Sequence, residues 1–268
     1  MEKIRESLER LYNSFDFGRA LQNDPIKFPK KFSYPLDIEI SAILSSSFAY
    51  GNINCFCNFL EKLFGIMGSN PSDFILEFKP KNLIKKLTIK YRFSSVYDIV
   101  AYMFILKMML RNSPSNSLEY YFNIANFNGQ FNRKYPETVS KITNFINIAL
   151  KVDLTPIYGR DIKTKGLLHF LPHPAKGSPC KRINLFLRWM VRNRDVDFGI
   201  WKIIKPAELI IPLDVHIWRV SKRWGFTDRN SQNLKAAIEI TEYLRQIEPE
   251  DPLKYDFVLC HSDINYLI

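Results

Sequence analysis

Apolar residues recur along this chain with the spacing of one helix face. Two such stripes stand near its start: Ile4, Leu8, Leu11 and Phe15, then Ile38, Ile40, Ile43, Leu44 and Phe48. A period near 3.6 residues places these side chains on one side of a helix, where they can pack against a core. No run of alternating polar and apolar residues is long enough to predict a sheet. The sequence therefore predicts an all-α fold.

The periodic segments predict a series of helices. Residues 96–110 are apolar nearly all round, which is typical of a helix buried at the centre of a domain. The other predicted helices cover residues 55–66, 118–126, 137–152, 179–194, 214–224, 231–246 and 252–260. With 268 residues, the chain is long enough for one large domain or for two small ones that share a cleft.

The charge balance favours a polyanionic partner. Lys and Arg outnumber Asp and Glu by 38 to 27, a net charge of +11, which suits nucleic acid or an acidic membrane surface. Residues 151–225 hold fifteen basic and six acidic side chains, and residues 176–194 hold six basic side chains and no acid. A solvated helix face is the alternative interpretation of such a run.

Several classes of site and location are excluded by what the sequence lacks. The four cysteines have no C-x-x-C spacing, so neither a zinc ribbon nor an iron–sulfur cluster is predicted. The four histidines form no i,i+4 pair with an acid between them, as a zincin site requires. The first residues are charged, and no window approaches the ~20 apolar residues of a spanning helix. We expect a cytoplasmic protein with reduced thiols and no metal.

Lys181 and Asp214 each stand where a helix is predicted to begin. In the first helical turn, Lys181 would stand at the positive end of the helix dipole and beside the cations Lys176 and Arg182. Both effects disfavour its protonated form, and an amine nucleophile must be deprotonated. Asp214 is most simply an N-cap, and capping is compatible with catalysis because a fixed carboxylate can face a developing cation. Alternatively, Lys181 is an ordinary surface or phosphate-binding lysine, and Asp214 is a purely structural cap.

The segments around these two residues resemble the helix-hairpin-helix DNA glycosylases, the superfamily of endonuclease III and 8-oxoguanine glycosylase. Residues 181–184, Lys-Arg-Ile-Asn, match the K-x-x-N pattern of that family. Residues 212–220, Pro-Leu-Asp-Val-His-Ile-Trp-Arg-Val, match its P-V-D-x-H-[VIM]-x-R-[VI] pattern, and Asp-Val-His-Ile-Trp is similar to the 8-oxoguanine branch. The interval of 33 residues from Lys181 to Asp214 is similar to the interval between the corresponding residues of archaeal-type and related bacterial 8-oxoguanine glycosylases.

Two features depart from the family pattern. The hairpin, usually L-P-G-[VI]-G, is Leu-Pro-His-Pro-Ala-Lys-Gly-Ser at residues 171–178, so its glycines are largely missing. The cysteines that hold the iron–sulfur cluster of endonuclease III are absent as well. The resemblance covers residues 166–225 most closely.

The resemblance implies two α-helical domains with double-stranded DNA held in a cleft between them. Residues 34–194 would form a central helical barrel, and residues 1–33 with 195–268 would form the second domain. The implied activity is that of a monomeric, nucleoid-associated glycosylase and AP lyase, without cofactor, that excises 8-oxoguanine. Lys181 would attack C1′ and Asp214 would stabilise the cationic sugar. A helix-hairpin-helix module that binds DNA structure without chemistry is the second hypothesis.

Further residues are expected to contact DNA. The flipped base is commonly held between aromatic or apolar faces, and the aromatic candidates are Trp218, Phe257 and Trp201, although core packing is the more common role of such rings. Asp263 is a further candidate for this pocket, because the end of the chain is expected to fold back beside the helix that bears Asp214. The candidates for the DNA backbone are Lys176, Gly177, Ser178 and Arg182, at the loop and helix start that resemble an anion-binding hairpin. Asn52 or Tyr50 would fill the gap left by the flipped base.

Overall fold

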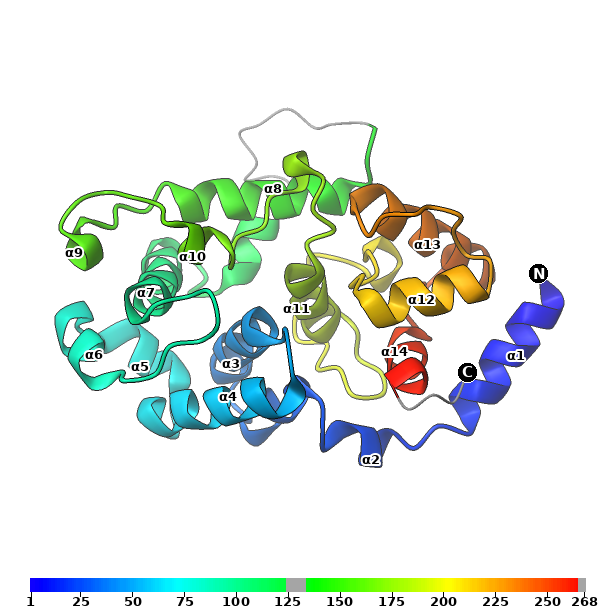
Figure 1. Cartoon of the computed structure of the whole chain (residues 1–268), viewed down its shortest axis with the longest axis horizontal. Helices are drawn as coiled ribbons and strands as arrows, with labels where there is room; N and C mark the ends of the chain where they lie inside the picture. Colours follow the sequence, from blue (N-terminus) through cyan, green and yellow to red (C-terminus); the bar gives the residue numbers. More distant parts are fainter. Residues whose placement is uncertain (124–133, 265–268) are drawn as a thin grey trace. The chain divides into compact units, whose positions relative to one another are not determined.

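The computed structural model describes residues 1–123 and 134–264, and all the regular elements in that part are helices (Figure 1). Its only β-type pairing among these residues is an isolated bridge between Tyr91 and Ser94. The predicted all-α fold is confirmed. No helix in the described ranges has the length and apolar character needed to cross a membrane.

The helices follow one another with short connections. The α-helices are α1 (Glu2–Asn13), α2 (Phe17–Leu21), α3 (Pro35–Phe48), α4 (Ile53–Met67), α5 (Pro71–Glu77), α6 (Pro80–Lys86), α7 (Val96–Asn112), α8 (Glu137–Leu150), α9 (Thr155–Tyr158), α10 (Lys165–Leu168), α11 (Lys181–Val191), α12 (Val215–Arg223), α13 (Leu234–Ile247) and α14 (Asp256–Ile264). Short 3-10 helices are η1 (Pro25–Lys27), η2 (Pro29–Lys31), η3 (Leu118–Phe122), η5 (Pro174–Lys176) and η6 (Pro206–Glu208).

The described residues group into two compact units. The first holds residues 1–24, 134–140 and 174–264, and the second holds residues 25–123 and 141–173. The helix that begins at Lys181 therefore groups with the helix that follows Asp214. The domain boundaries inferred from the family resemblance, 34–194 and 1–33 with 195–268, stay a prediction.

The second unit is built around α7. Most of its residues are buried, and it contacts α5, α6, α9 and α10, as expected for a helix that is apolar nearly all round. Its start is fixed by a capping box, in which the Ser95 hydroxyl accepts from the Asp98 backbone N–H and the Asp98 carboxylate accepts from the Ser95 N–H.

The first unit contains a buried network of arginines and carboxylates. Arg188 on α11 donates to Asp256 at 2.5 Å, and Arg192, the residue that follows α11, pairs with Asp251 at 2.8 Å. Asp197 pairs with both arginines, whose side chains are 3% and 1% exposed. Burial opposes the charge of both guanidinium groups, but the carboxylates outweigh it and raise their pKa values. Part of the basic run at 176–194 is thus neutralised inside the protein and is not a solvated face.

Several helix boundaries differ from the predicted ones. The helix predicted at 179–194 covers only Lys181–Val191, because Cys180 is left-handed (φ 49°) and Arg192 is extended. The helix predicted at 252–260 is α14, which begins four residues later. The segment predicted at 118–126 is a 3-10 helix as far as Phe122, and residues 124–126 lie outside the described ranges.

Candidate functional site

The loop before α11 presents Lys181 as the first residue of that helix. Gly177 adopts φ 78°, a left-handed conformation that glycine adopts without strain, and its carbonyl accepts from the Leu234 backbone N–H at 2.9 Å. The loop is thereby held against the start of α13. The Lys181 side chain is 27% exposed, so it is partly open to solvent at the mouth of the helix.

Asp214 caps α12, as the sequence predicts. Its Oδ1 accepts from the backbone N–H groups of His216 and Ile217, both at 3.0 Å. These two bonds use one carboxylate oxygen and fix the orientation of the group. The other oxygen, Oδ2, is left to face a different partner.

That partner is Lys181. Its Nζ lies 3.7 Å from Asp214 Oδ2, and the Asp214 side chain is 22% exposed. The distance exceeds that of a hydrogen bond, so the contact is an ion pair between two partly exposed side chains. The structure therefore places an amine and a fixed carboxylate, 33 residues apart in the sequence, side by side at two helix starts. Such a pair can combine nucleophilic attack with stabilisation of a developing cation.

Cys260 is a third side chain at this position, and sequence reasoning missed it. Its Sγ lies 4.0 Å from Asp214 Oδ2. Burial, and then the negative charges of Asp214 and Asp256, raise the pKa of the Cys260 thiol well above its usual value. The thiol therefore stays protonated at neutral pH and faces the carboxylate as a donor. No motif marks this residue in the sequence.

Asp263 on α14 faces three basic side chains of α12. It is 5% exposed, accepts from His216 Nδ1 at 2.9 Å and Arg219 at 2.8 Å, and lies 3.9 Å from Arg223. Burial opposes ionisation, but the hydrogen bonds from His216 and Arg219 outweigh it and lower the pKa of Asp263. The last described helix, α14, thus lies beside α12, the helix that follows Asp214 (Figure 1).

The three aromatic candidates for a base pocket have different surroundings. Trp218 on α12 is partly exposed, and its buried Nε1 has no hydrogen-bond partner within residues 1–123 and 134–264. Trp201 is 3% exposed with its ring 5.0 Å from that of Phe186, and Phe257 is 2% exposed and stacked on Phe17. Core packing thus explains Trp201 and Phe257, and their contact with a base stays a prediction.

The four candidates for the DNA backbone line the loop and the start of α11. Lys176 and Gly177 are exposed, and the Ser178 hydroxyl accepts from the Cys180 backbone N–H at 3.2 Å. Arg182 is only 9% exposed. Lys176 is therefore the side chain of this set that is most open to an anion.

Asn52 and Tyr50 lie in the second unit, between α3 and α4. The Asn52 side chain caps α4 by accepting from the Asn54 N–H at 2.9 Å. Tyr50 lies next to Arg92, whose guanidinium is 5.7 Å from the Tyr50 ring and 5.4 Å from the Phe93 ring. Phe93 is 68% exposed. Sequence reasoning missed this exposed pair, Arg92 and Phe93, because helical periodicity carries no signal in a turn.

The described part of the chain contains no group of three or more His, Cys, Asp or Glu residues that could hold a metal ion. Comparison with known proteins gives one family. A family model described as a protein of unknown function, DUF2400, matches residues 24–265, which include both Lys181 and Asp214. No curated protein and no solved structure matches the chain.

Proposed function

The chain belongs to the DUF2400 family of proteins of unknown function, and from its Lys181–Asp214 pair we propose that it is a DNA glycosylase with AP-lyase activity. The observation that carries the proposal is the 3.7 Å approach of Lys181 Nζ to Asp214 Oδ2. Both residues lie in the segments that resemble the helix-hairpin-helix glycosylases. From that resemblance, Lys181 is assigned the role of nucleophile and Asp214 that of the stabilising carboxylate.

The rest of the chain is consistent with a DNA substrate. A net charge of +11 attracts the phosphate backbone. The exposed ring of Phe93 beside Arg92 suits stacking on a base, since aromatic rings and guanidinium planes both pack on base faces. A target base must leave the stack before an enzyme can reach its sugar.

The proposed reaction has three steps. Lys181 releases one ammonium proton to solvent, and its amine then attacks C1′ of the flipped nucleotide while the glycosidic bond breaks. The base leaves with the bonding electrons and takes up a proton from solvent. Asp214 stabilises the positive charge that develops on the sugar. The nitrogen then loses one proton, and O4′ takes one up as the C1′–O4′ bond breaks and the sugar ring opens to a protonated Schiff base. Finally, removal of a C2′ proton expels the 3′ phosphate and cuts the strand.

We propose 8-oxoguanine opposite cytosine as the substrate. This base differs from guanine chiefly by an N7–H donor and the C8 oxygen, so a selective pocket needs an acceptor directed at N7. The Asp-Val-His-Ile-Trp segment at residues 214–218 and the 33-residue interval support this choice through the family resemblance.

Borohydride trapping tests the proposed function. Reduction of a Schiff base would join the protein covalently to a duplex that contains 8-oxoguanine or an abasic site. Lys181→Gln should abolish trapping and strand cleavage but keep DNA affinity within about an order of magnitude, since one charge among many is lost. Lys235→Gln, which removes an exposed lysine of α13 in the same unit, is the matched control and should trap normally.

The outcomes separate the alternatives. Undiminished trapping by Lys181→Gln would contradict the assignment of the nucleophile, and Lys176 and Lys205 would be the next lysines to test. DNA binding without any trapping would favour a module that binds DNA structure without chemistry. Faster release of thymine glycol, uracil or 3-methyladenine than of 8-oxoguanine would replace the substrate but keep the mechanism.

A further inference from the structure

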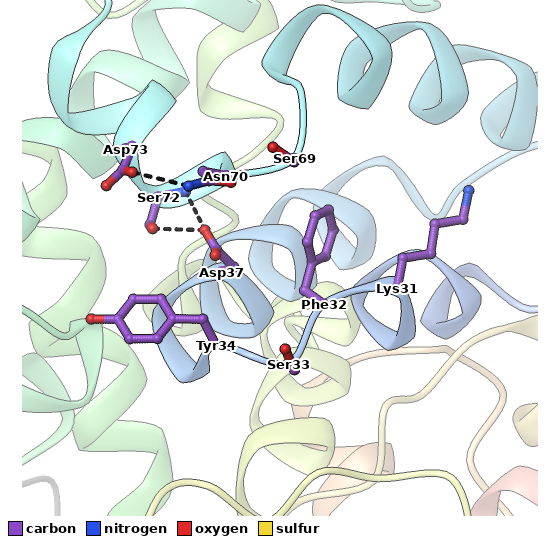
Figure 2. A pocket seen from close by; sticks show the side chains of 9 residues that line it. All are labelled: Lys31, Phe32, Ser33, Tyr34, Asp37, Ser69, Asn70, Ser72 and Asp73. Atoms are coloured by element: carbon purple, nitrogen blue, oxygen red, sulfur yellow. Dashed lines mark hydrogen bonds between the residues drawn. The ribbon is translucent and has the colours of Figure 1, made fainter.

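A polar pocket of about 500 Å³ lies in the second unit, remote in sequence from Lys181 and Asp214 (Figure 2). It is formed by the loop before α3, the first turn of α3, and the turn that leads into α5. Its volume falls within the range of pockets that bind small molecules. All of its lining residues belong to one compact unit.

Asp37 is the central side chain of this pocket. It is only 7% exposed, and its Oδ1 accepts from both the backbone N–H and the hydroxyl of Ser72, at 2.8 and 2.7 Å. Its Oδ2 has no hydrogen-bond partner among the residues that the structure describes, and Figure 2 shows no contact drawn to it. This oxygen is open to the pocket, where it can pair with a cation from outside the chain.

The charge of the pocket is opposite to that of the protein. Asp37 and Asp73 contribute two carboxylates. The single ammonium group, that of Lys31, lies over the ring of Phe28 at 5.2 Å from its centroid. In a chain of net charge +11, this pocket repels DNA phosphates and attracts cations.

Aromatic rings complete the lining. Phe32 is partly exposed and Tyr34 is 61% exposed, and both lie on the loop that runs into α3 (Figure 2). Aromatic faces attract organic ammonium groups and pack on methylene chains. They offer nothing to a divalent metal ion, which takes six or more oxygen ligands.

We propose that this pocket binds a linear diamine or polyamine. One ammonium group pairs with Asp37 Oδ2, the second pairs with the exposed carboxylate of Asp73, and the carbon chain between them packs on Phe32 and Tyr34. Two carboxylates call for two ammonium groups, which distinguishes this ligand from a simple amine. The proposal does not depend on the glycosylase chemistry.

Titration calorimetry on the full chain tests the proposal, with putrescine, spermidine, butylamine and magnesium chloride as separate probes in about 0.15 M salt. We expect saturable binding of putrescine and spermidine at one site per chain, tighter than that of butylamine. Asp37→Asn should weaken spermidine binding by about tenfold or more, because it removes the charge from a buried ion pair. Glu61→Gln removes an exposed acid of the same unit outside the pocket and should leave binding unchanged.

Two further variants guard against a folding defect. In Asp37→Asn, the amide oxygen can still accept the hydrogen bonds from Ser72. If this variant nevertheless fails to fold, Asp73→Asn and Tyr34→Ala replace exposed side chains of the pocket, and each should weaken spermidine binding. Lys181→Gln should bind spermidine as the wild type does, so failure of the proposed glycosylase activity and failure of this site are distinguishable. Three results would overturn the proposal: absence of saturable amine binding, wild-type affinity for spermidine in both Asp37→Asn and Asp73→Asn, or magnesium binding that excludes spermidine.

Discussion

The two oxygens of the Asp214 carboxylate have separate tasks. Oδ1 caps α12 and Oδ2 faces Lys181, so a variant can remove the charge without removing the cap. Asp214→Asn should change the free energy of unfolding little but slow base release by on the order of a hundredfold or more. Asp214→Ala, the matched control, should in addition cost about 1 kcal/mol of stability through the lost cap. Single-turnover excision rates and denaturant unfolding measure the two effects.

A normal excision rate in Asp214→Asn together with a lowered stability would instead assign a purely structural role to this carboxylate.

The Lys181–Asp214 pair could be predicted because each residue stands at a helix start within a recognisable segment. Cys260 and Arg188 could not be predicted in the same way. Their partners lie 46 residues away, at Asp214, and 68 residues away, at Asp256, and periodicity carries no information on such distant contacts.

At the scale of elements, α12 and α14 are joined by Asp263. The lowered pKa of this carboxyl means that its ionised form stabilises the folded protein. That stabilisation is fully present above the unfolded pKa of about 3.9 and is lost as the pH falls through the lower folded value. Asp263→Asn should therefore lower the free energy of unfolding by about 1–3 kcal/mol at pH 7, and the difference from wild type should shrink below about pH 4.

Urea unfolding across this pH range checks the prediction. Asp228→Asn is the control, since this exposed carboxylate lies just beyond α12 and is not ion-paired to α14 within the described residues. A difference that is independent of pH would mean that Asp263 acts through packing and not through its charge.

The helices themselves were largely predictable, since α7 and α13 follow the apolar period and α13 begins at a side-chain cap on Asn233. The ends of α11 were not, because a left-handed residue such as Cys180 is rare and has no sequence signal. The start of α14 was placed four residues early for a related reason: Pro252 suits a first helical turn, but a turn at 252–255 precedes the helix.

At the scale of the whole molecule, the positive charge available to DNA lies outside the buried network, in which Arg188 and Arg192 are neutralised by Asp197, Asp251 and Asp256. Lys176, in contrast, is exposed on the loop before Lys181.

If Lys176 contacts a phosphate, Lys176→Gln should weaken DNA binding similarly for damaged and undamaged duplexes. It should also reduce the slope of log K against the logarithm of the salt concentration by about one unit. Lys235→Gln, an equal change of charge at an exposed site on α13, should leave that slope unchanged. Fluorescence anisotropy at several salt concentrations measures the slopes. Equal slopes for wild type and Lys176→Gln would remove this lysine from the DNA interface, whereas a loss confined to damaged duplexes would place it at the lesion.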